Sequence, residues 1–267
     1  MKKYLSIFKI SFQQEFAYKF NFIMWRVRNI MQILVFFFLW SAVFETNTGE
    51  IFGYTKEKIL TYGFVLILIR AITLSSRSVD IAGQISNGEL SNLILKPINY
   101  FKYWVTRDLS SKLLNAIFAI FEISILLVIL KPPIFIQTNF LYLFLFLISL
   151  AISMFIFFNI LMLTNFVPFW APEVAWGAQF LVVVVVVEFL SGAFFPIDVF
   201  PTAIYRLLQF TPFPYLVFAP IKIYLGNFSI TQSIWSLVIG GGWAIVLWVL
   251  MNSVWKKGLK VYEAVGR

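Results

Sequence analysis

The sequence predicts an all-α polytopic membrane protein, and two observations support this fold class. Hydrophobic side chains make up 61% of the 267 residues and charged side chains only 12%, whereas soluble domains average about 45–50% and about 25%. Uncharged runs such as 140–163 also reach the ~20 residues that a helix needs to cross a bilayer. We therefore expect residues 1–267 to form one transmembrane domain.

Six spans are expected, because backbone amides in hydrocarbon must be paired within their own segment and each apolar run should then be helical. This reasoning includes the valine run 182–187, whose β-branched residues would favour a strand in water. The expected limits are 23–44, 59–79, 113–130, 140–163, 174–195 and 233–254.

The N-terminal segment 1–22 is expected to be an interfacial helix. Apolar residues recur there at three- and four-residue spacing, which is typical of a helix lying among lipid head groups. No signal-peptide pattern precedes the stripe, since polar residues interrupt the sequence where an apolar core would be needed. The stripe consists of Leu5, Phe8, Phe12, Phe16 and Phe20. A role in contacting a cytosolic partner is the alternative to a simple anchor.

The first span contains Arg26 and Arg28 before its uncharged part begins at Ile30. We expect both arginines to extend toward the head groups while the helix continues, as long basic side chains commonly do near helix ends.

The distribution of basic residues predicts the orientation. Most of the 21 lysines and arginines precede the first span, lie between the second and third, or follow the sixth. By the positive-inside rule both termini should be cytoplasmic, which places the protein in a prokaryotic inner membrane as a multi-pass protein. The net charge of +9 is then explained by topology, and no nucleic-acid partner is expected.

Two soluble segments remain. The larger cytosolic one is 80–112. The segment 195–228, on the outer side, carries five prolines within an apolar sequence. We expect it to form short broken helices that re-enter the outer leaflet, where protein or water satisfies the freed backbone groups.

Composition also limits the chemistry. The chain has no Cys and no His, which excludes thiolate nucleophiles, imidazole bases and zinc sites built from those residues. The stretch from Gly83 to Gly88 has the glycine spacing of a phosphate loop, but Glu89 stands where that loop needs its lysine. We therefore expect no catalytic residue, no resident metal and no cofactor bound by this chain.

Three ionisable residues lie within expected spans: Arg70, Glu122 and Glu188. Each costs about 2.5–3.5 kcal/mol at a helix centre, so compensation is required. An Arg70–Glu122 or Arg70–Glu188 pair that joins helices is one hypothesis. The other is that these residues line a translocation path, with Glu188 contacting substrate.

A short helix is expected after Gly88, because Leu90, Leu93 and Ile94 share one face and Pro97 ends the segment. The sequence Gly88-Glu89-Leu90 through Pro97 resembles the cytosolic coupling region of ABC-2-type permeases. A second motif, with Ser191 and Gly192 followed by Pro196 and Pro201, is similar to the outer gate pattern of that family. The tail Tyr262-Glu263-Ala264-Val265-Gly266 resembles its compact branch.

The resemblance implies a membrane-spanning permease subunit of an ATP-driven exporter. Such a subunit pairs with a second permease copy or a related permease and docks a pair of cytosolic ABC ATPase subunits, which bind ATP and Mg. Gly88 to Pro97 would then enter a cleft on the ATPase.

Two other functions stay open at this point. A secondary transporter driven by an ion gradient would usually show discontinuous helices around a midplane site or an inverted repeat, and neither pattern is visible. A membrane-embedded lipid-modifying enzyme would need convergent carboxylates or metal ligands. The substrate itself, whether lipid, drug, peptide or glycolipid, is not predicted.

Overall fold

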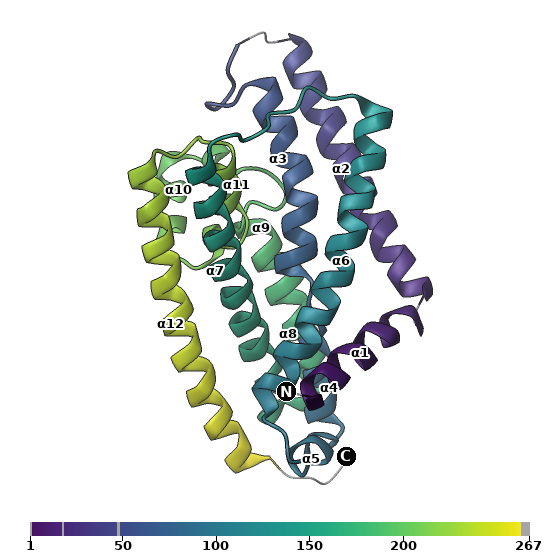
Figure 1. Ribbon diagram of the computed structural model, residues 1–267. Coiled ribbons are helices and arrows are strands. Elements are labelled where there is room, and N and C mark those ends of the chain that lie inside the picture. The colour runs from purple at the N-terminus through teal and green to yellow at the C-terminus, as the bar shows by residue number, and fades with distance from the viewer. Residues whose placement is uncertain (1, 18, 47–48, 263–267) are drawn as a thin grey trace.

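The computed structural model describes residues 2–17, 19–46 and 49–262, with the side chains of 15–22 outside that description. Regular structure in this part of the chain is helical, apart from an isolated bridge between Ile51 and Tyr54. Five of its helices are long and apolar enough to cross a membrane, and a bent helix pair makes a sixth candidate span. The predicted fold class is confirmed (Figure 1).

The six spans form a bundle, with short helices at both ends. In chain order the spans are α2 (Lys19–Thr46), α3 (Lys56–Ile69) with a π-helical turn (Arg70–Leu74), α6 (Tyr100–Leu130), α7 (Phe140–Asn165), a composite fifth span, and α12 (Ile230–Val261). The short helices are α1 (Lys2–Ala17), α4 (Asp80–Ser86), α5 (Leu90–Ile94), α10 (Thr202–Gln209) and α11 (Phe218–Tyr224). We call the end that carries α4, α5 and both described chain ends the basal end (Figure 1).

The second span ends earlier than predicted. It stops at Leu74 rather than Val79, and the following helical pair, Arg77–Ser86, is bent away from it by 46°. Ser75 and Ser76 have extended backbone conformations at the break. The Ser76 hydroxyl accepts a hydrogen bond from the Ser78 amide, which starts the next turn.

The third and sixth spans are longer than predicted. α6 begins at Tyr100 rather than 113, because the Asn99 side chain caps it by accepting a hydrogen bond from the Lys102 amide. α12 begins with a capping box formed by Ser229 and Gln232. Its 32 residues would rise ~48 Å at ~1.5 Å each, so it extends beyond a hydrocarbon core of ~30 Å.

The fifth span is built from α8 (Ala175–Gln179), a π-helix (Phe180–Val187) and α9 (Glu188–Leu190). The valine run is helical as expected, but in the wider π form, and the helix ends at Leu190 rather than at 195. Only 6% of the span's most apolar window is buried within the chain.

The expected broken helices between the fifth and sixth spans are present as α10, α11 and two 3-10 turns, Ile197–Val199 and Phe213–Tyr215. α11 packs against α7, and residues 218–223 are all buried. α11 therefore forms part of the core, whereas in α10 only Leu208 is buried.

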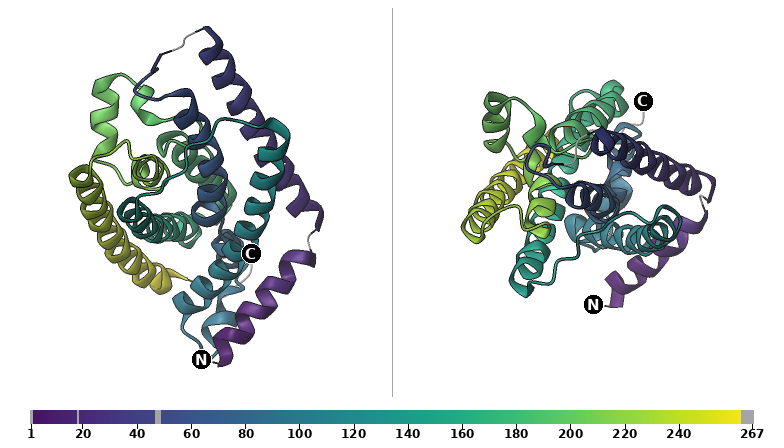
Figure 2. Two further views of the ribbon diagram at one scale, coloured as in Figure 1. Left: turned by 45° about the horizontal axis from the view of Figure 1, so that its top comes forward. Right: turned by 90° about the horizontal axis from the view of Figure 1, so that it is seen from above.

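α1 lies against the basal part of α6, at an angle to the bundle (Figures 1 and 2). Ser110 of α6 donates a hydrogen bond to the Phe8 carbonyl, and Lys3 donates one to the Pro97 carbonyl. Within the predicted stripe Leu5 is 58% exposed, Phe8 and Phe12 are partly buried, and the side chains of Phe16 and Phe20 lie outside the described residues, so the interfacial position stays a prediction.

Candidate functional site

A cavity of about 830 Å³ opens beside the break in the second span. Most of its lining comes from α2, the segment from the π-helical turn to the start of α4, α6, and the fifth span around the valine run. Five arginines and two acidic residues contribute to this lining: Arg26, Arg28, Arg70, Arg77, Arg107, Asp80 and Glu188. We call it the arginine cavity.

Glu188 is held by two arginines. Its Oε1 accepts a hydrogen bond of 3.0 Å from Arg28 Nη2, and its Oε2 lies 3.6 Å from Arg70 Nη2. Arg70 also donates to the Gln32 side chain and to the Ala193 carbonyl, the latter at 2.9 Å. The Arg70–Glu188 pair expected from the sequence is therefore present, with Arg28 as an additional partner.

Glu122 has a different partner from the one expected. It lies 3.4 Å from Arg26 rather than beside Arg70, and Arg26 also donates to Asn115 at 2.5 Å. The expectation that Arg26 and Arg28 extend to the head groups is also wrong. The Arg26 side chain is only 11% exposed, because α2 places both arginines opposite carboxylates of other helices.

A second, apolar cavity of about 550 Å³ adjoins the first and shares Arg28, Asn29 and Arg70 with it. It runs between α2 and α3 and reaches residues 193–195 after the fifth span. Its apolar lining includes Ile33, Val35, Phe36, Leu39, Trp40 and Leu66.

The segment from Gly88 to Pro97, which we call the coupling segment after its expected role, has the predicted short helix. Gly88 has a positive φ of 73°, a conformation that glycine adopts without the strain of a Cβ, and α5 follows at once. Gly83 lies inside the helix α4, so this stretch is helix–turn–helix and not the strand–loop–helix of a phosphate loop.

The exposed face of α5 differs from the predicted one. Leu90 is fully buried and Leu93 is 8% exposed, whereas Ile94 is 45% and Leu95 84% exposed. Leu90 and Leu93 pack instead into a basal aromatic cluster of the chain itself, which contains Tyr100, Trp104, Phe166, Phe169 and Trp255. Glu89 and Pro97 are exposed beside Ile94 and Leu95.

The basal aromatic cluster ties α5 to three spans. Tyr100 of α6 stacks on Trp255 of α12 with ring centroids 4.2 Å apart, and Phe166, at the end of α7, lies 5.2 Å from the same indole. Tyr262, after α12, accepts a hydrogen bond from the Ser91 amide of α5. The rest of the predicted tail motif, residues 263–266, lies outside the described residues.

The motif after the fifth span is a tight turn. Gly192 has a φ of 88°, and a Cβ there would lie 2.8 Å from the Tyr62 hydroxyl oxygen, which itself donates to the Gly192 carbonyl at 2.7 Å. Ser191 and Pro196 are buried with Gly192, whereas Pro201 is exposed.

A polar cluster follows this turn in the segment 195–228, around Asp198. Lys222 of α11 lies 2.9 Å from Asp198, and the Tyr54 hydroxyl donates to the same carboxylate at 3.1 Å. Burial first, and then the charge of Asp198, raise the pKa of Tyr54 far above its usual value. Tyr54 therefore stays neutral and acts as a hydrogen-bond donor.

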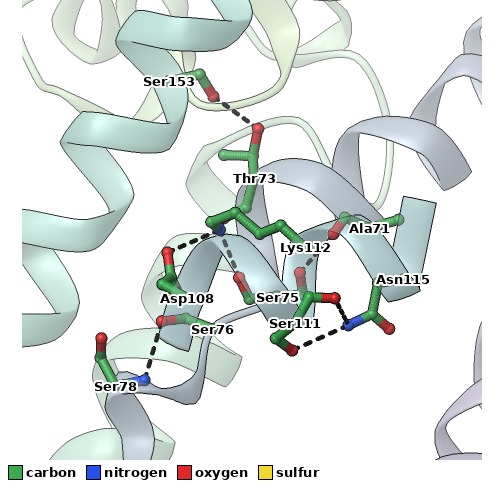
Figure 3. Close-up of polar contacts among 10 residues, drawn as sticks. All are labelled: Ala71, Thr73, Ser75, Ser76, Ser78, Asp108, Ser111, Lys112, Asn115 and Ser153. Carbon is green, nitrogen blue, oxygen red and sulfur yellow. Dashed lines mark hydrogen bonds and ion pairs between the residues drawn. The ribbon is translucent and has the colours of Figure 1, made fainter. Parts of the chain in front are cut away.

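Sequence analysis did not identify the buried lysine of α6. Lys112 donates to the carbonyls of Thr73 and Ser75 at 3.1 and 2.5 Å and lies 3.3 Å from Asp108 (Figure 3). These three acceptors match the three N–H groups of an ammonium. The only sequence signal was the i,i+4 spacing of Asp108 and Lys112 beside an apolar run.

The sequence matches a known protein family over most of its length. A family model described as "ABC-2 family transporter protein" matches residues 30–266, which is nearly the whole chain. None of the curated proteins compared with the chain matches it.

Proposed function

Since this chain belongs to the ABC-2 family of transporter proteins, and is thus the membrane subunit of an ABC transporter, we propose that it drives export with separate ATPase subunits. Two cytosolic ABC ATPases bind ATP and Mg²⁺, and two permease chains, identical or related, form the translocation path. The permease itself carries no catalytic residue and no cofactor.

The proposed orientation places the basal end in the cytoplasm of a prokaryotic cell, with both termini there. Lys256, Lys257 and Lys260 near the end of α12 support it, as do Lys96 and Lys102 around α5. Such clustering is typical of cytoplasmic loops and ends. The composite fifth span, little buried within one chain, leaves an apolar face for a second permease or for lipid.

The observation that carries the proposal is the division of the coupling segment into two faces. Leu90 and Leu93 anchor it in the basal aromatic cluster, while Ile94 and Leu95 are exposed at an end that should face water. An apolar side chain that is 84% exposed at such a place suits a helix-in-groove contact with a soluble partner.

The same arrangement connects the proposed ATPase contact to the spans α6 and α12. When the ATPase cleft moves Leu95, the anchored face of α5 pulls on Tyr100 of α6 and Trp255 of α12. ATP then drives transport by stabilising one of two access states more than the other. In this scheme Arg70, Glu122 and Glu188 line the path, and the turn at Ser191, Gly192, Pro196 and Pro201 forms the outer gate.

Co-purification tests the coupling contact. The tagged permease is co-expressed with the ABC ATPases of the same organism, and the ATPase retained on the permease is measured. Leu95→Asp should lower retention at least tenfold while the variant still inserts and elutes as a single species. Leu207→Asp is the matched control, because Leu207 is 69% exposed on α10 at the opposite end, and it should leave retention unchanged.

Full retention by Leu95→Asp would contradict the proposed contact. Transport that persists without the ATPase and stops when the ion gradient is collapsed would favour a secondary transporter instead. Leu93→Asp is not a substitute for Leu95→Asp, because it would disrupt the chain's own core.

A further inference from the structure

The two adjoining cavities have complementary chemistry. The arginine cavity brings five arginines together with two acidic residues, whereas the neighbouring cavity is lined mainly by aliphatic and aromatic side chains. We propose that they form one binding site for an amphiphile with an anionic head group and a hydrocarbon tail. This inference rests on the proposed function, because it names the class of substrate that the permease takes from the membrane.

The arginine cavity, which would hold the head group, contains buried donors without a hydrogen-bond partner. The Nε atoms of Arg70 and Arg107 are buried and have no hydrogen-bond partner. Buried donors of this kind normally find an acceptor, since leaving one unpaired costs about 1–3 kcal/mol. A phosphate or carboxylate fits this demand, because guanidinium groups bind such anions through two parallel hydrogen bonds.

The anionic preference follows from the charge balance. Glu188 is already bound by Arg28 and Arg70, and Asp80 lies 3.5 Å from Arg107. The acidic side chains of the cavity are therefore engaged by its own arginines, which outnumber them. A cationic head group would have to displace an arginine from one of these ion pairs, whereas an anionic head group is attracted by the excess of positive charge.

The apolar cavity, which would hold the tail, begins where the arginine cavity ends. Arg28, Asn29 and Arg70 line both cavities, so they mark the boundary between them. From Arg28 to Leu39 the α2 wall of the apolar cavity spans twelve residues, and the eleven rises of ~1.5 Å between them give a length of ~17 Å. A single extended alkyl chain fits along a wall of that length.

The direction of the site matches that of a lipid in the cytoplasmic leaflet. α2 begins next to α1, about halfway along the bundle, and runs away from the basal end to the opposite end (Figures 1 and 2), so the arginines lie nearer the basal end than Val35 and Leu39. With the basal end in the cytoplasm, the head group faces inward and the tail points toward the membrane midplane. An amphiphile can therefore enter laterally without turning over.

Binding is tested on the full chain alone, purified in phosphatidylcholine nanodiscs. Tryptophan fluorescence is the readout, because Trp25 and Trp40 line the two cavities. The probes share a dodecyl tail: dodecyl phosphate, dodecylphosphocholine and dodecyltrimethylammonium. Inorganic phosphate supplies the head group without a tail. Dodecyl phosphate should bind saturably and at least tenfold more tightly than each of the other three.

Two variants separate head-group from tail recognition. Arg28→Gln should weaken dodecyl phosphate at least tenfold and should still fold, because Arg70 remains beside Glu188; Arg28→Lys should recover part of the loss. Val35→Gln should lower the affinity for dodecyl phosphate without changing the preference for the anionic probe over the other dodecyl probes. Arg206→Gln, an exposed arginine of α10, is the control and should change nothing.

Equal binding of the cationic or zwitterionic probe would overturn the anionic preference, and inorganic phosphate as tight as dodecyl phosphate would overturn the role of the tail. Unchanged affinity in Arg28→Gln would place the site elsewhere. The measurement needs no ATPase, so failure of ATPase co-purification with probe binding retained would count against the proposed function and not against this site.

Discussion

The ammonium of Lys112 donates a 3.1 Å hydrogen bond to the main-chain carbonyl of Thr73, across the boundary between α6 and the end of the second span. The helix that ends at Leu74 leaves carbonyls without intrahelical partners, as every helix end does. Lys112 provides the missing donor from a neighbouring helix. The break that carries the 46° bend is therefore held by a side chain 39 residues away.

We expect Lys112→Met to destabilise the protein by about 3–5 kcal/mol, because it leaves the buried Asp108 carboxylate without its ion pair. Unfolding by denaturant titration in mixed micelles measures the change. Lys102→Met, an exposed lysine of the same helix, should change stability by less than about 0.5 kcal/mol. If Lys112→Met lowers the free energy of unfolding as little as Lys102→Met does, Lys112 does not hold the break.

Gly258→Ala should also destabilise the protein, by about 1–3 kcal/mol from overpacking. A Cβ at this position would lie 2.2 Å from the Phe169 ring, at the basal aromatic cluster. Gly241→Ala in the same helix meets nothing within 4 Å and should be neutral or stabilising by up to about 1 kcal/mol, through better helix propensity. Thermal unfolding followed by tryptophan fluorescence compares the two, and a higher midpoint for Gly258→Ala would refute this packing argument.

Arg26 and Glu122 should behave as a coupled pair. In a double-mutant cycle with Arg26→Gln and Glu122→Gln, we expect a coupling energy of about 0.5–3 kcal/mol, because either single change leaves a charge within the membrane-spanning region. Free energies of unfolding of the four proteins give this value. A parallel cycle that combines Arg26→Gln with Asp198→Asn, at the other end of the bundle, should be additive; comparable coupling in both cycles would exclude a specific pair.

The stability should fall as the pH rises above about 10, the ordinary pKa of tyrosine. Burial and Asp198 raise the pKa of Tyr54 in the folded chain, so only the unfolded chain releases the Tyr54 proton in this range. The stabilisation that Tyr54 provides is thus complete below pH ~10 and is lost as the pH increases. Unfolding midpoints between pH 8 and 11 should decline less steeply in Tyr54→Phe than in the wild type, and parallel curves would contradict this.

Apolar run length predicted the five candidate spans and the bent pair that makes a sixth candidate, because the bilayer imposes a length requirement that is visible in the sequence. Span ends were less predictable. α6 continues to Tyr100 because Asn99 caps it, although charged residues at 102, 107 and 112 suggested a loop. A helix cap such as Asn99 can be recognised in the sequence, but the prediction gave more weight to the charged residues and therefore started the span too late.

Side-chain partners depended on the assembled bundle. The sequence indicated that Glu122 and Glu188 need cationic partners, but only the assembled bundle brings Arg26 of α2 to Glu122 and Arg28 to Glu188. For the coupling segment, periodicity grouped Leu90, Leu93 and Ile94. It did not indicate that the chain's own aromatic residues cover the first two and leave Ile94 with Leu95 exposed.

The coupling segment separates a buried side from an exposed one. In the proposed contact, substitutions at residues 94–96 would change the surface that the ATPase meets and leave the anchoring leucines and their aromatic neighbours intact. The specificity for an ATPase could therefore be altered at a few surface positions without repacking the basal aromatic cluster.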